Sequence, residues 1–324
     1  MAKRRKGRPI DGVFILDKPD NMSSNGALQA VKRLFYAQKA GHTGSLDPLA
    51  TGVLPICLGE STKFSQFLLD ADKEYETTVR LGERTTTSDA EGEVVEAFDA
   101  SHITKKMVQK ALKNFEGEIN QIPSMFSALK HNGQPLYKLA RQGIEIERKV
   151  RQVEIYEIEL LDFRPGEVAE VDLVVFCSKG TYIRSIAEDL GQDLEVGGHV
   201  SALRRTIAGP FDIEQALTLD DLAERRDNGL AEVLDELLLP VDACVEDVPV
   251  MTIAESGGHY LRHGQPIMEA QVYKFGTEGD MVRVYLESGE FIGLCEIDSE
   301  DRLAPKRVIV PASDPSRADG AAKN

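Results

Sequence analysis

One carboxylate of this chain stands in a loop whose backbone is closely constrained. Asp47 lies in the run Gly41-His42-Thr43-Gly44-Ser45-Leu46-Asp47-Pro48-Leu49-Ala50-Thr51-Gly52-Val53-Leu54-Pro55, which contains three glycines and two prolines and leads into an apolar segment. Glycine permits backbone conformations and close approaches that other residues do not, and proline fixes φ and removes a donor. The sequence therefore predicts a loop that presents Asp47 for catalysis as a nucleophile or base. Taken alone, the loop favours the simpler interpretation, an aspartate that caps a turn, because most loop aspartates do so.

Short strands and amphipathic helices surround this loop. Segments 13–16, 53–58 and 73–81 are predicted to be strands, and Ser23, Ser24 or Asn25 can cap a helix between the first two. Further along, the pattern predicts a helix over 104–115, strands over 150–161 and 168–177, and a helix from 183 that Gly191 ends. Short strands over 281–286, 291–297 and 307–310 follow Pro240 and Pro249. They predict a small C-terminal β domain.

Length and composition favour one large domain and one small one. The 324 residues, 42% of them hydrophobic, can bury a substantial core. No apolar run approaches the roughly 18 residues of a membrane span, and the basic start lacks the apolar stretch of a signal peptide, so we expect a cytoplasmic protein. Cys57, Cys177, Cys244 and Cys295 form no Cys-x-x-Cys pair, which indicates reduced, mostly buried thiols.

The charge distribution is uneven. Asp and Glu number 54 against 38 Lys and Arg, a net charge of −16, whereas surfaces that bind RNA are usually positive. Residues 212–247 hold twelve acidic side chains against two arginines, and this surface is expected to face away from RNA. Residues 125–151 and the first eight residues are locally basic, which is sufficient to steer a polyanion.

Several segments, in order, resemble one protein family. They are His42 to Lys63, Gly12-Val13-Phe14-Ile15-Leu16-Asp17-Lys18-Pro19 with Ser23-Ser24-Asn25, Lys73-Glu74-Tyr75, Ile122-Pro123-Ser124-Met125-Phe126-Ser127-Ala128, and Cys177-Ser178-Lys179-Gly180-Thr181-Tyr182-Ile183-Arg184. Together they resemble the bacterial tRNA pseudouridine-55 synthases of the TruB type over roughly residues 10–312. That family carries a single essential aspartate in its signature loop.

The resemblance implies an architecture and an activity. It implies an α/β protein of the α+β type, with a mixed, largely antiparallel central sheet, flanking helices and a small C-terminal β-rich PUA-like domain. We expect a disordered basic arm over 1–9, a catalytic domain over 10–249 with an inserted thumb at about 122–150, a PUA-like RNA-binding domain over 250–312, and a disordered tail over 313–324. The implied reaction converts uridine 55 in the T loop of tRNA to pseudouridine by base flipping.

The resemblance also assigns site residues. Asp47 matches the essential aspartate, and Arg184 matches an arginine that keeps it ionised. Tyr75 and Tyr182 match aromatic residues that cradle the uracil. Tyr75 is also assigned to the catalytic residues. Leu203 matches an apolar wall of the pocket. His42 matches a histidine that supports flipping, and Lys18 with Pro19 braces the loop from below.

The reaction breaks the N1–C1′ bond and remakes the link through C5 without net oxidation, so no metal or cofactor is expected. Asp47 could attack C1′, attack C6 or remove a sugar proton, and residue types leave these routes open. The T arm of tRNA is the expected partner, with no membrane, no metal and no protein partner implied, and the chain is expected to be a monomer.

Local alternatives compete with these assignments. Arg184 could pair with Glu188 one helical turn on, and Arg204 with Arg205 is as compatible with a solvated strand edge as with phosphate contact. His259 and His263 are four residues apart, but Arg262 between them opposes zinc.

Two other kinds of protein fit the sequence less well. Asp17 and Asp20 have the wrong spacing for a magnesium-dependent phosphoryl transferase. A protein that only folds the tRNA elbow would use the same arm and thumb, but it would not need the Asp47 loop. An Asp47→Asn variant separates an enzyme from such a chaperone.

Overall fold

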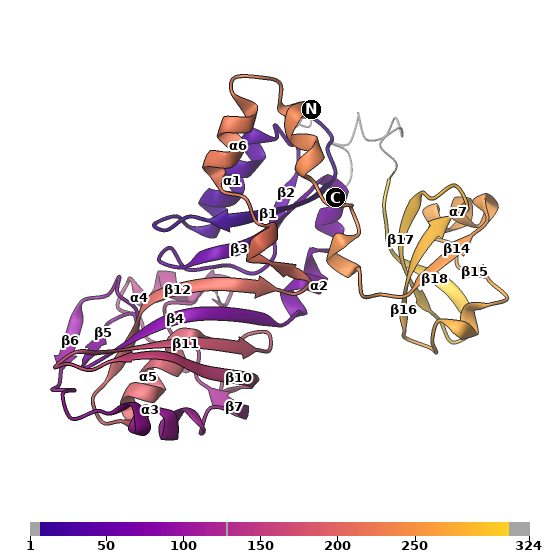
Figure 1. The fold of residues 1–324 in the computed structure, drawn as a ribbon. Coiled ribbons are helices and arrows are strands. Elements are labelled where there is room, and N and C mark those ends of the chain that lie inside the picture. Colours follow the sequence, from indigo (N-terminus) through magenta and orange to yellow (C-terminus); the bar gives the residue numbers. More distant parts are fainter. Residues whose placement is uncertain (1–6, 128, 311–324) are drawn as a thin grey trace.

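A twisted mixed sheet forms the frame of the larger part of the molecule (Figure 1). The computed structural model describes residues 7–127 and 129–310. Along the sheet the strand order is β1-β3-β12-β4-β11-β10-β7; β3 and β12 run parallel and the other neighbours antiparallel. The strands span β1 Gly12–Lys18, β3 Thr51–Leu58, β4 Lys73–Leu81, β7 Gly117–Gln121, β10 Arg151–Arg164, β11 Ala169–Cys177 and β12 Gly198–Ala208, with β2 Ala40–His42 and β13 Phe211–Asp212 paired at the edges. This confirms the predicted largely antiparallel sheet.

Helices cover one face of this sheet along its whole length. Their apolar sides join the sheet residues in one continuous core, because alternate residues of each strand point to the same face. The helices are α1 Ser24–Leu34, α3 Lys105–Leu112, α5 Ile183–Asp193 and α6 Leu219–Arg226. Ser23, one of the three predicted caps, caps α1 through its side-chain oxygen, and Thr104 caps α3 in the same way. Tyr75 packs against the edge of the same core.

The opposite face is covered at the end that carries β1 and β3. A second core lies there, built from Val13, Ile15 and Val53 of the sheet together with α2 (Ser65–Asp70) and the 3-10 turn η4 (Ala243–Val245). Phe14 and Leu16 of the same β1 strand belong instead to the helix-covered core, which shows the two-residue alternation directly.

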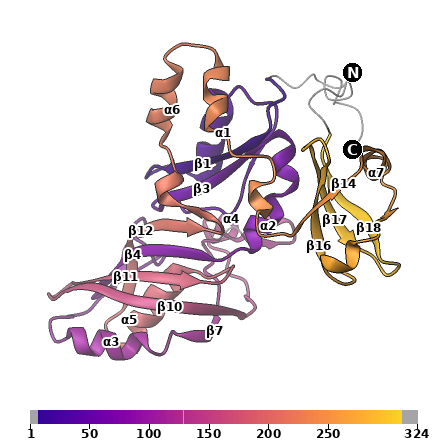
Figure 2. The same cartoon turned by 45° about the vertical axis from the view of Figure 1, so that its right-hand side comes forward.

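A separate five-stranded sheet follows at the C-terminal side and lies beside that second core (Figure 2). Its order is β14-β16-β17-β18-β15, and it packs with α7 around its own core. The elements are β14 Val250–Ile253, α7 Glu255–Arg262, β15 Ile267–Met268, β16 Met281–Leu286, β17 Phe291–Ile297 and β18 Arg302–Val308. Phe291 stacks on Phe64 with 5.5 Å between the ring centroids, and Lys63 Nζ donates to the carbonyl of Val308 at 2.7 Å. The C-terminal β-rich part is thus confirmed, although β18 begins five residues before the predicted 307–310.

The segment between β7 and β10 projects from the sheet as a small substructure, which we call the thumb (122–150). It holds a hairpin of two strands, each two residues long, and one short helix: β8 Lys130–His131, β9 Gln134–Pro135 and α4 Leu136–Ala140. From 137 to 150 no residue is buried. The remaining elements are β5 Glu83–Thr85, β6 Val94–Ala97, and the 3-10 helices η1 Gly59–Lys63, η2 Ile213–Gln215, η3 Ala231–Leu237 and η5 Val272–Lys274.

Two local predictions are wrong. Helix α5 continues through Gly191 to Asp193 instead of ending there. A Cβ at Gly191 would lie 2.2 Å from the backbone of Gly197, so this glycine permits a close backbone approach to the turn before β12 and does not stop the helix.

A disordered basic arm is expected over residues 1–9, but Arg8 is held against the catalytic domain. It donates to Asp235 and to the carbonyl of Phe35 at 2.9 Å, so the expected arm does not extend as far as residue 8. Residues 1–6 and 311–324 lie outside the described residues, and with them the rest of the expected arm and tail. Within 7–127 and 129–310, no helix combines the length and apolar character needed to cross a membrane.

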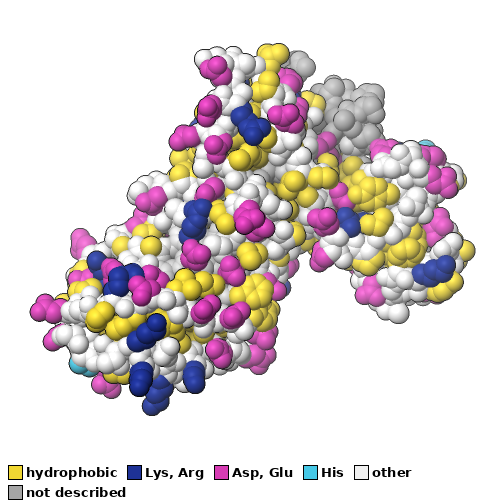
Figure 3. All heavy atoms as spheres, viewed as in Figure 1, with side chains coloured by type: hydrophobic (Ala, Val, Ile, Leu, Met, Phe, Trp, Pro, Cys, Tyr) yellow, Lys and Arg dark blue, Asp and Glu magenta, His cyan; other side chains and the backbone are white. Residues whose placement is uncertain are grey.

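Surface charge follows the elements (Figure 3). In this view, acidic side chains are spread over α6 and the upper sheet, while Lys and Arg side chains gather at the lower end of the molecule where α3 lies. The acidic surface predicted for 212–247 is therefore carried by α6, η3 and the turns around them.

Candidate active site

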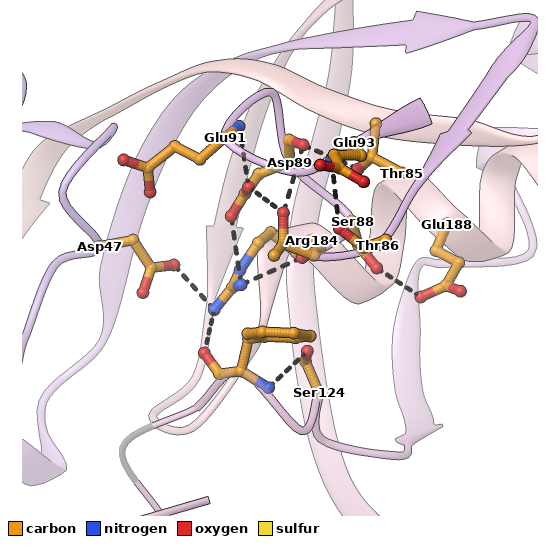
Figure 4. Close-up of polar contacts among 12 residues, drawn as sticks. Asp47, Thr85, Thr86, Ser88, Asp89, Glu91, Glu93, Ser124, Arg184 and Glu188 are labelled. Atoms are coloured by element: carbon orange, nitrogen blue, oxygen red, sulfur yellow. Dashed lines mark hydrogen bonds and ion pairs between the residues drawn. The ribbon is translucent and has the colours of Figure 1, made fainter. Parts of the chain in front are cut away.

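Asp47 and Arg184 meet at one end of the helix-covered core. Arg184 Nη2 lies 2.9 Å from Asp47 Oδ2, and its Nη1 lies 3.2 Å from Asp89 Oδ2 (Figure 4). The guanidinium also donates to the carbonyls of Thr87 at 3.2 Å and Phe126 at 3.0 Å. The arginine is thus held between two carboxylates on different loops. Its side chain is 5% exposed, whereas that of Asp47 is 37% exposed.

The helix pair that competed for Arg184 is absent. Glu188 accepts instead from Ser88 Oγ at 2.9 Å and lies 3.5 Å from Arg84. Arg184 is the second residue of α5, and Tyr182 is the residue just before the helix. The side-chain amide of Gln121 binds the backbone N–H and C=O of Tyr182 at 2.9 and 3.2 Å. Because β7 fixes Gln121, the start of α5 and therefore Arg184 are fixed to the sheet.

The Asp47 loop is held from below by buried polar groups. Ser24 Oγ accepts from the Leu46 N–H at 2.7 Å and lies 2.9 Å from its carbonyl oxygen. Lys18 is fully buried, and its Nζ donates to the carbonyls of Pro19, Met22 and Pro48 at 2.8, 2.6 and 3.2 Å. Burial lowers the pKa of Lys18 to about 8. These contacts place the Lys18 ammonium between the Asp47 loop and the turn after β1.

The charge state of Asp47 is set by opposing effects. Burial raises the pKa of its carboxyl above the ordinary value, the positive charge of Arg184 lowers it, and the negative charge of Asp89 raises it again. Burial dominates, so the net shift is upward. Arg184 therefore reduces the penalty for ionising Asp47 and does not bring its pKa below the ordinary value.

A pocket of about 570 Å³ opens beside Asp47. Its wall is formed by the Asp47 loop, the start of β4, the middle of β12, the start of α5 and the first part of the thumb. The lining residues are Gly44, Ser45, Leu46, Asp47, Leu69, Lys73, Tyr75, Ser127, Leu129, Gly180, Thr181, Tyr182, Ile183, Arg184, Leu203 and Arg205. Tyr75, Tyr182 and Leu203 thus lie together with Asp47 and Arg184 around one space, and burial raises the pKa of both phenols.

His42 is placed differently from the other assigned residues. It ends β2 and is not among the residues that line the pocket. Its ring Nδ1 is buried and has no hydrogen-bond partner within the described residues, and burial together with the positive charge of Arg205 lowers the pKa of the imidazole. The histidine lies under the entrance to the Asp47 loop.

Neither arginine of the Arg204-Arg205 pair is free to bind phosphate in this structure. Arg204 forms a two-point ion pair with Asp17, at 2.7 and 3.1 Å, and Arg205 is 1% exposed. The pairing of Asp17 also removes the carboxylate that a phosphoryl transferase would need. His259 and His263 stack at 4.4 Å on α7, and no group of three or more metal-ligating side chains occurs within the part of the chain that the structure describes.

Sequence reasoning missed two buried groups of this site. Asp89 is 2% exposed and lies in a polar turn between β5 and β6 that carries no distinguishing local pattern. Lys73 stands out in the sequence only as part of the Lys73-Glu74-Tyr75 segment, yet it is buried in the pocket wall, with its Nζ on the carbonyls of Leu68, Leu69 and Ala71. Only the three-dimensional approach of distant segments identifies either residue.

Comparison with known proteins agrees with this geometry. A family model described as the N-terminal domain of TruB family pseudouridylate synthases matches residues 32–183. A tRNA pseudouridylate synthase B C-terminal domain model matches 184–246, and a C-terminal domain model of pseudouridine synthase II TruB matches 249–309. The sheet, the pocket and these matches define a pseudouridine synthase.

Relatives cover nearly the whole chain. A tRNA pseudouridine synthase B of Saccharophagus degradans is 60% identical over 307 residues, 95% of this chain and 98% of its own length. One from Photobacterium profundum is 51% identical, covering 97% and 99%. Within the pseudouridine synthases, the chain belongs to the TruB family.

Solved structures give the same fold. The chain matches a structure titled as a Cbf5-Nop10-Gar1 complex with a TM-score of 0.68 and 28% identity over 93% of this chain and 85% of the other. It matches an H/ACA RNP bound to a substrate RNA with a TM-score of 0.68 and 26% identity, over 97% and 92%.

Proposed function

We propose that this protein is an isomerase that converts uridine 55 in the T loop of tRNA to pseudouridine. The observation that carries the proposal is the contact of Asp47 with Arg184 at 2.9 Å, at the wall of a pocket that two tyrosines also line. The relatives at 51–60% identity are named as tRNA pseudouridine synthases. No cofactor or metal is part of the proposal.

The residues divide the work by position. Asp47 acts on the nucleoside, Arg184 favours its ionised form, and Tyr75 and Tyr182 offer flat surfaces to a base that has lost its stacking neighbours. Leu203 closes the apolar side. His42 supports flipping from outside the pocket, and Lys18 with Pro19 holds the loop. Attack on C1′, attack on C6 and removal of a sugar proton all remain open to Asp47, because each needs the carboxylate beside the ribose.

The rest of the molecule supplies RNA contacts in this proposal. The catalytic domain spans 10–249, the thumb closes over the T loop, and the PUA-like domain of 250–312 binds RNA beyond it. The thumb carries exposed Lys130, Lys138, Arg141 and Lys149. The chain works as a cytoplasmic monomer.

The test uses a T-arm hairpin whose target uridine carries tritium at C5. Forming pseudouridine replaces the C5–H bond by the bond to C1′, so the wild-type protein is expected to release tritium to water, and Asp47→Asn is expected to bind the hairpin without release. Glu91→Gln, on a neighbouring carboxylate that forms no ion pair within the described residues, is the matched control and should retain release. Folded wild-type protein that releases none would refute the proposal.

A further inference from the structure

Arg205 is a buried cation that the roles above leave unused. It is 1% exposed, which makes it the largest fully buried side chain among the described residues. Its Nε donates to the carbonyl of Val53 at 2.8 Å, and its Nη2 donates to the carbonyl of Gly44 at 3.2 Å. Both acceptors are neutral, and the side chain lies in the wall of the pocket.

No carboxylate compensates this charge. Within 7–127 and 129–310, no Asp or Glu oxygen lies within 4.0 Å of the Arg205 guanidinium, whereas Arg184 on the other side of the pocket has two such partners. Lys73 adds a second buried cation to the same wall, and it too donates to backbone carbonyls, those of Leu68, Leu69 and Ala71. Burial, assisted by the charge of Arg205, lowers the pKa of Lys73 to about 8. A buried charge is costly unless something of opposite sign balances it.

The position of Arg205 relative to the base site follows from the sheet. Tyr75 on β4 and Arg205 on β12 are directly opposite in the antiparallel register, so their side chains emerge from the same face, with Cβ atoms about 5 Å apart. Leu203, two residues earlier, shares that face. Arg205, Tyr75 and Leu203 therefore project from one face of the sheet, and all three line the pocket that holds the proposed uracil site.

The reaction produces the missing negative charge. When the N1–C1′ bond breaks, its electron pair stays with the base, and the detached uracil is an anion delocalised over N1, O2 and O4. After the ring rotates, C5 bonds to C1′, the C5 proton leaves and N1 takes up a proton, so the product is an isomer of the substrate. The anion exists only between these two steps.

Resting on the proposed function, we propose that Arg205 is a fixed positive charge that stabilises the detached uracil anion in the pocket. A charge already in place in a low-dielectric site needs no reorganisation as the bond breaks, and it favours the transition state over the neutral substrate. Arg184 cannot fill this role, because two carboxylates already neutralise it. The detached uracil anion, which exists only during catalysis, would then balance the charge of Arg205.

The experiment compares uridine with 5-fluorouridine at the target position of the T-arm hairpin. Fluorine at C5 withdraws electrons and stabilises the uracil anion by itself, so the fluorinated base depends less on a protein cation. Single-turnover loss of the N-glycoside is measured by nuclease digestion and chromatography. We expect Arg205→Gln to slow uridine about 10²-fold and 5-fluorouridine about 10-fold, so that the ratio of the two rates changes about 10-fold. Arg205→Lys, which keeps the charge, should keep the wild-type ratio.

The rate ratio does not depend on how much of a variant is folded, because both substrates meet the same protein. An equal loss for both substrates, including a complete loss, would mean that Arg205 only holds the Gly44 and Val53 carbonyls in place, and it would overturn the inference. Arg204→Gln removes the neighbouring guanidinium, which is paired with Asp17, and should leave the ratio unchanged.

Arg205 also lies within hydrogen-bonding reach of the Tyr75 hydroxyl, so a second comparison separates direct action on the base from action through this phenol. In a Tyr75→Phe background, Arg205→Gln should still change the ratio, since the cation acts on the base. Loss of the effect there would mean that Arg205 works only through the Tyr75 hydroxyl and would also overturn the inference. If the wild-type protein converts neither substrate, the proposed function itself fails, and this result is distinct from an unchanged ratio.

Discussion

The two sides of the pocket are built very differently. The Asp47 loop is bound by Lys18 and Ser24 from below and by the Arg205 guanidinium from β12. The thumb (122–150) supplies Ser127 and Leu129 to the same pocket, but its outer half has no buried residue and exposes Ile144 and Val150. One side is held by many long-range contacts, and the other by few.

This difference suggests a division of labour. Groups that act on the nucleoside must be held within a fraction of an ångström, which the buried contacts of the loop provide. A segment that must admit a folded RNA arm and then cover it needs the opposite property, few contacts to break. Changes to the loop side should therefore affect turnover and stability, and changes to the thumb should affect RNA affinity.

The largest effect is expected at Asp89. Asp89→Asn removes one of the two charges that hold Arg184, so the guanidinium can shift toward the remaining carboxylate and misplace Asp47. We expect kcat to fall about 10²- to 10³-fold while hairpin affinity stays within about twofold. Single-turnover rates and filter binding measure the two quantities.

Asp172→Asn is the control for this change, because Asp172 pairs with Arg164 on an exposed part of the sheet. It should retain turnover. A loss of affinity as large as the loss of kcat in Asp89→Asn would show that the Arg184 cluster belongs to RNA binding, and the contrast between the two sides would fail.

Lys18 tests the same side through stability. Lys18→Met keeps the buried volume but leaves the carbonyls of Pro19, Met22 and Pro48 without their shared donor. We expect the free energy of unfolding to fall by about 2–3 kcal/mol, measured by urea denaturation. Lys106→Met, at an exposed lysine of α3, should change it by less than about 0.5 kcal/mol. An equal loss of unfolding free energy in the two variants would contradict a stabilising role of Lys18 under the loop.

The sequence predicted the loop side better than the rest of the site, for a physical reason. Glycines and prolines act on their own backbone, so the Asp47 loop was visible locally, and the alternation of 73–81 located β4 to the residue. Gly191 misled because its role is to admit a distant backbone segment, which no local pattern reports. Arg184 had a local competitor in Glu188, and only the family resemblance connected it to Asp47. Asp89 and the burial of Arg205 arise from contacts between segments far apart in the chain.

The thumb should respond more weakly. Neutralising Lys138 and Arg141 together by glutamine removes two exposed charges of the thumb. We expect KM to rise about three- to tenfold at unchanged kcat. The slope of log Kobs against log salt concentration should become less negative by about one to two. Arg225→Gln, on the acidic helix α6, is the control and should leave both unchanged. A fall in kcat with constant KM would mean that the thumb positions the reacting groups.

The smallest effect concerns the cost of holding Asp47 charged. Its folded pKa lies above the ordinary value of 3.8, so the folded state binds this proton more tightly than the unfolded state, and stability falls as the pH rises through that window. Asp47→Asn cannot ionise and escapes this loss. We expect its Tm at pH 7 to exceed that of the wild-type protein by about 1–2 °C, with the difference vanishing below the ordinary carboxyl pKa, as measured by calorimetry at several pH values. A lower Tm at neutral pH would show that the contact with Arg184 outweighs burial. The ionised Asp47 carboxylate would then stabilise the folded protein. The group needed for turnover would in that case no longer reduce the stability of the loop side of the pocket.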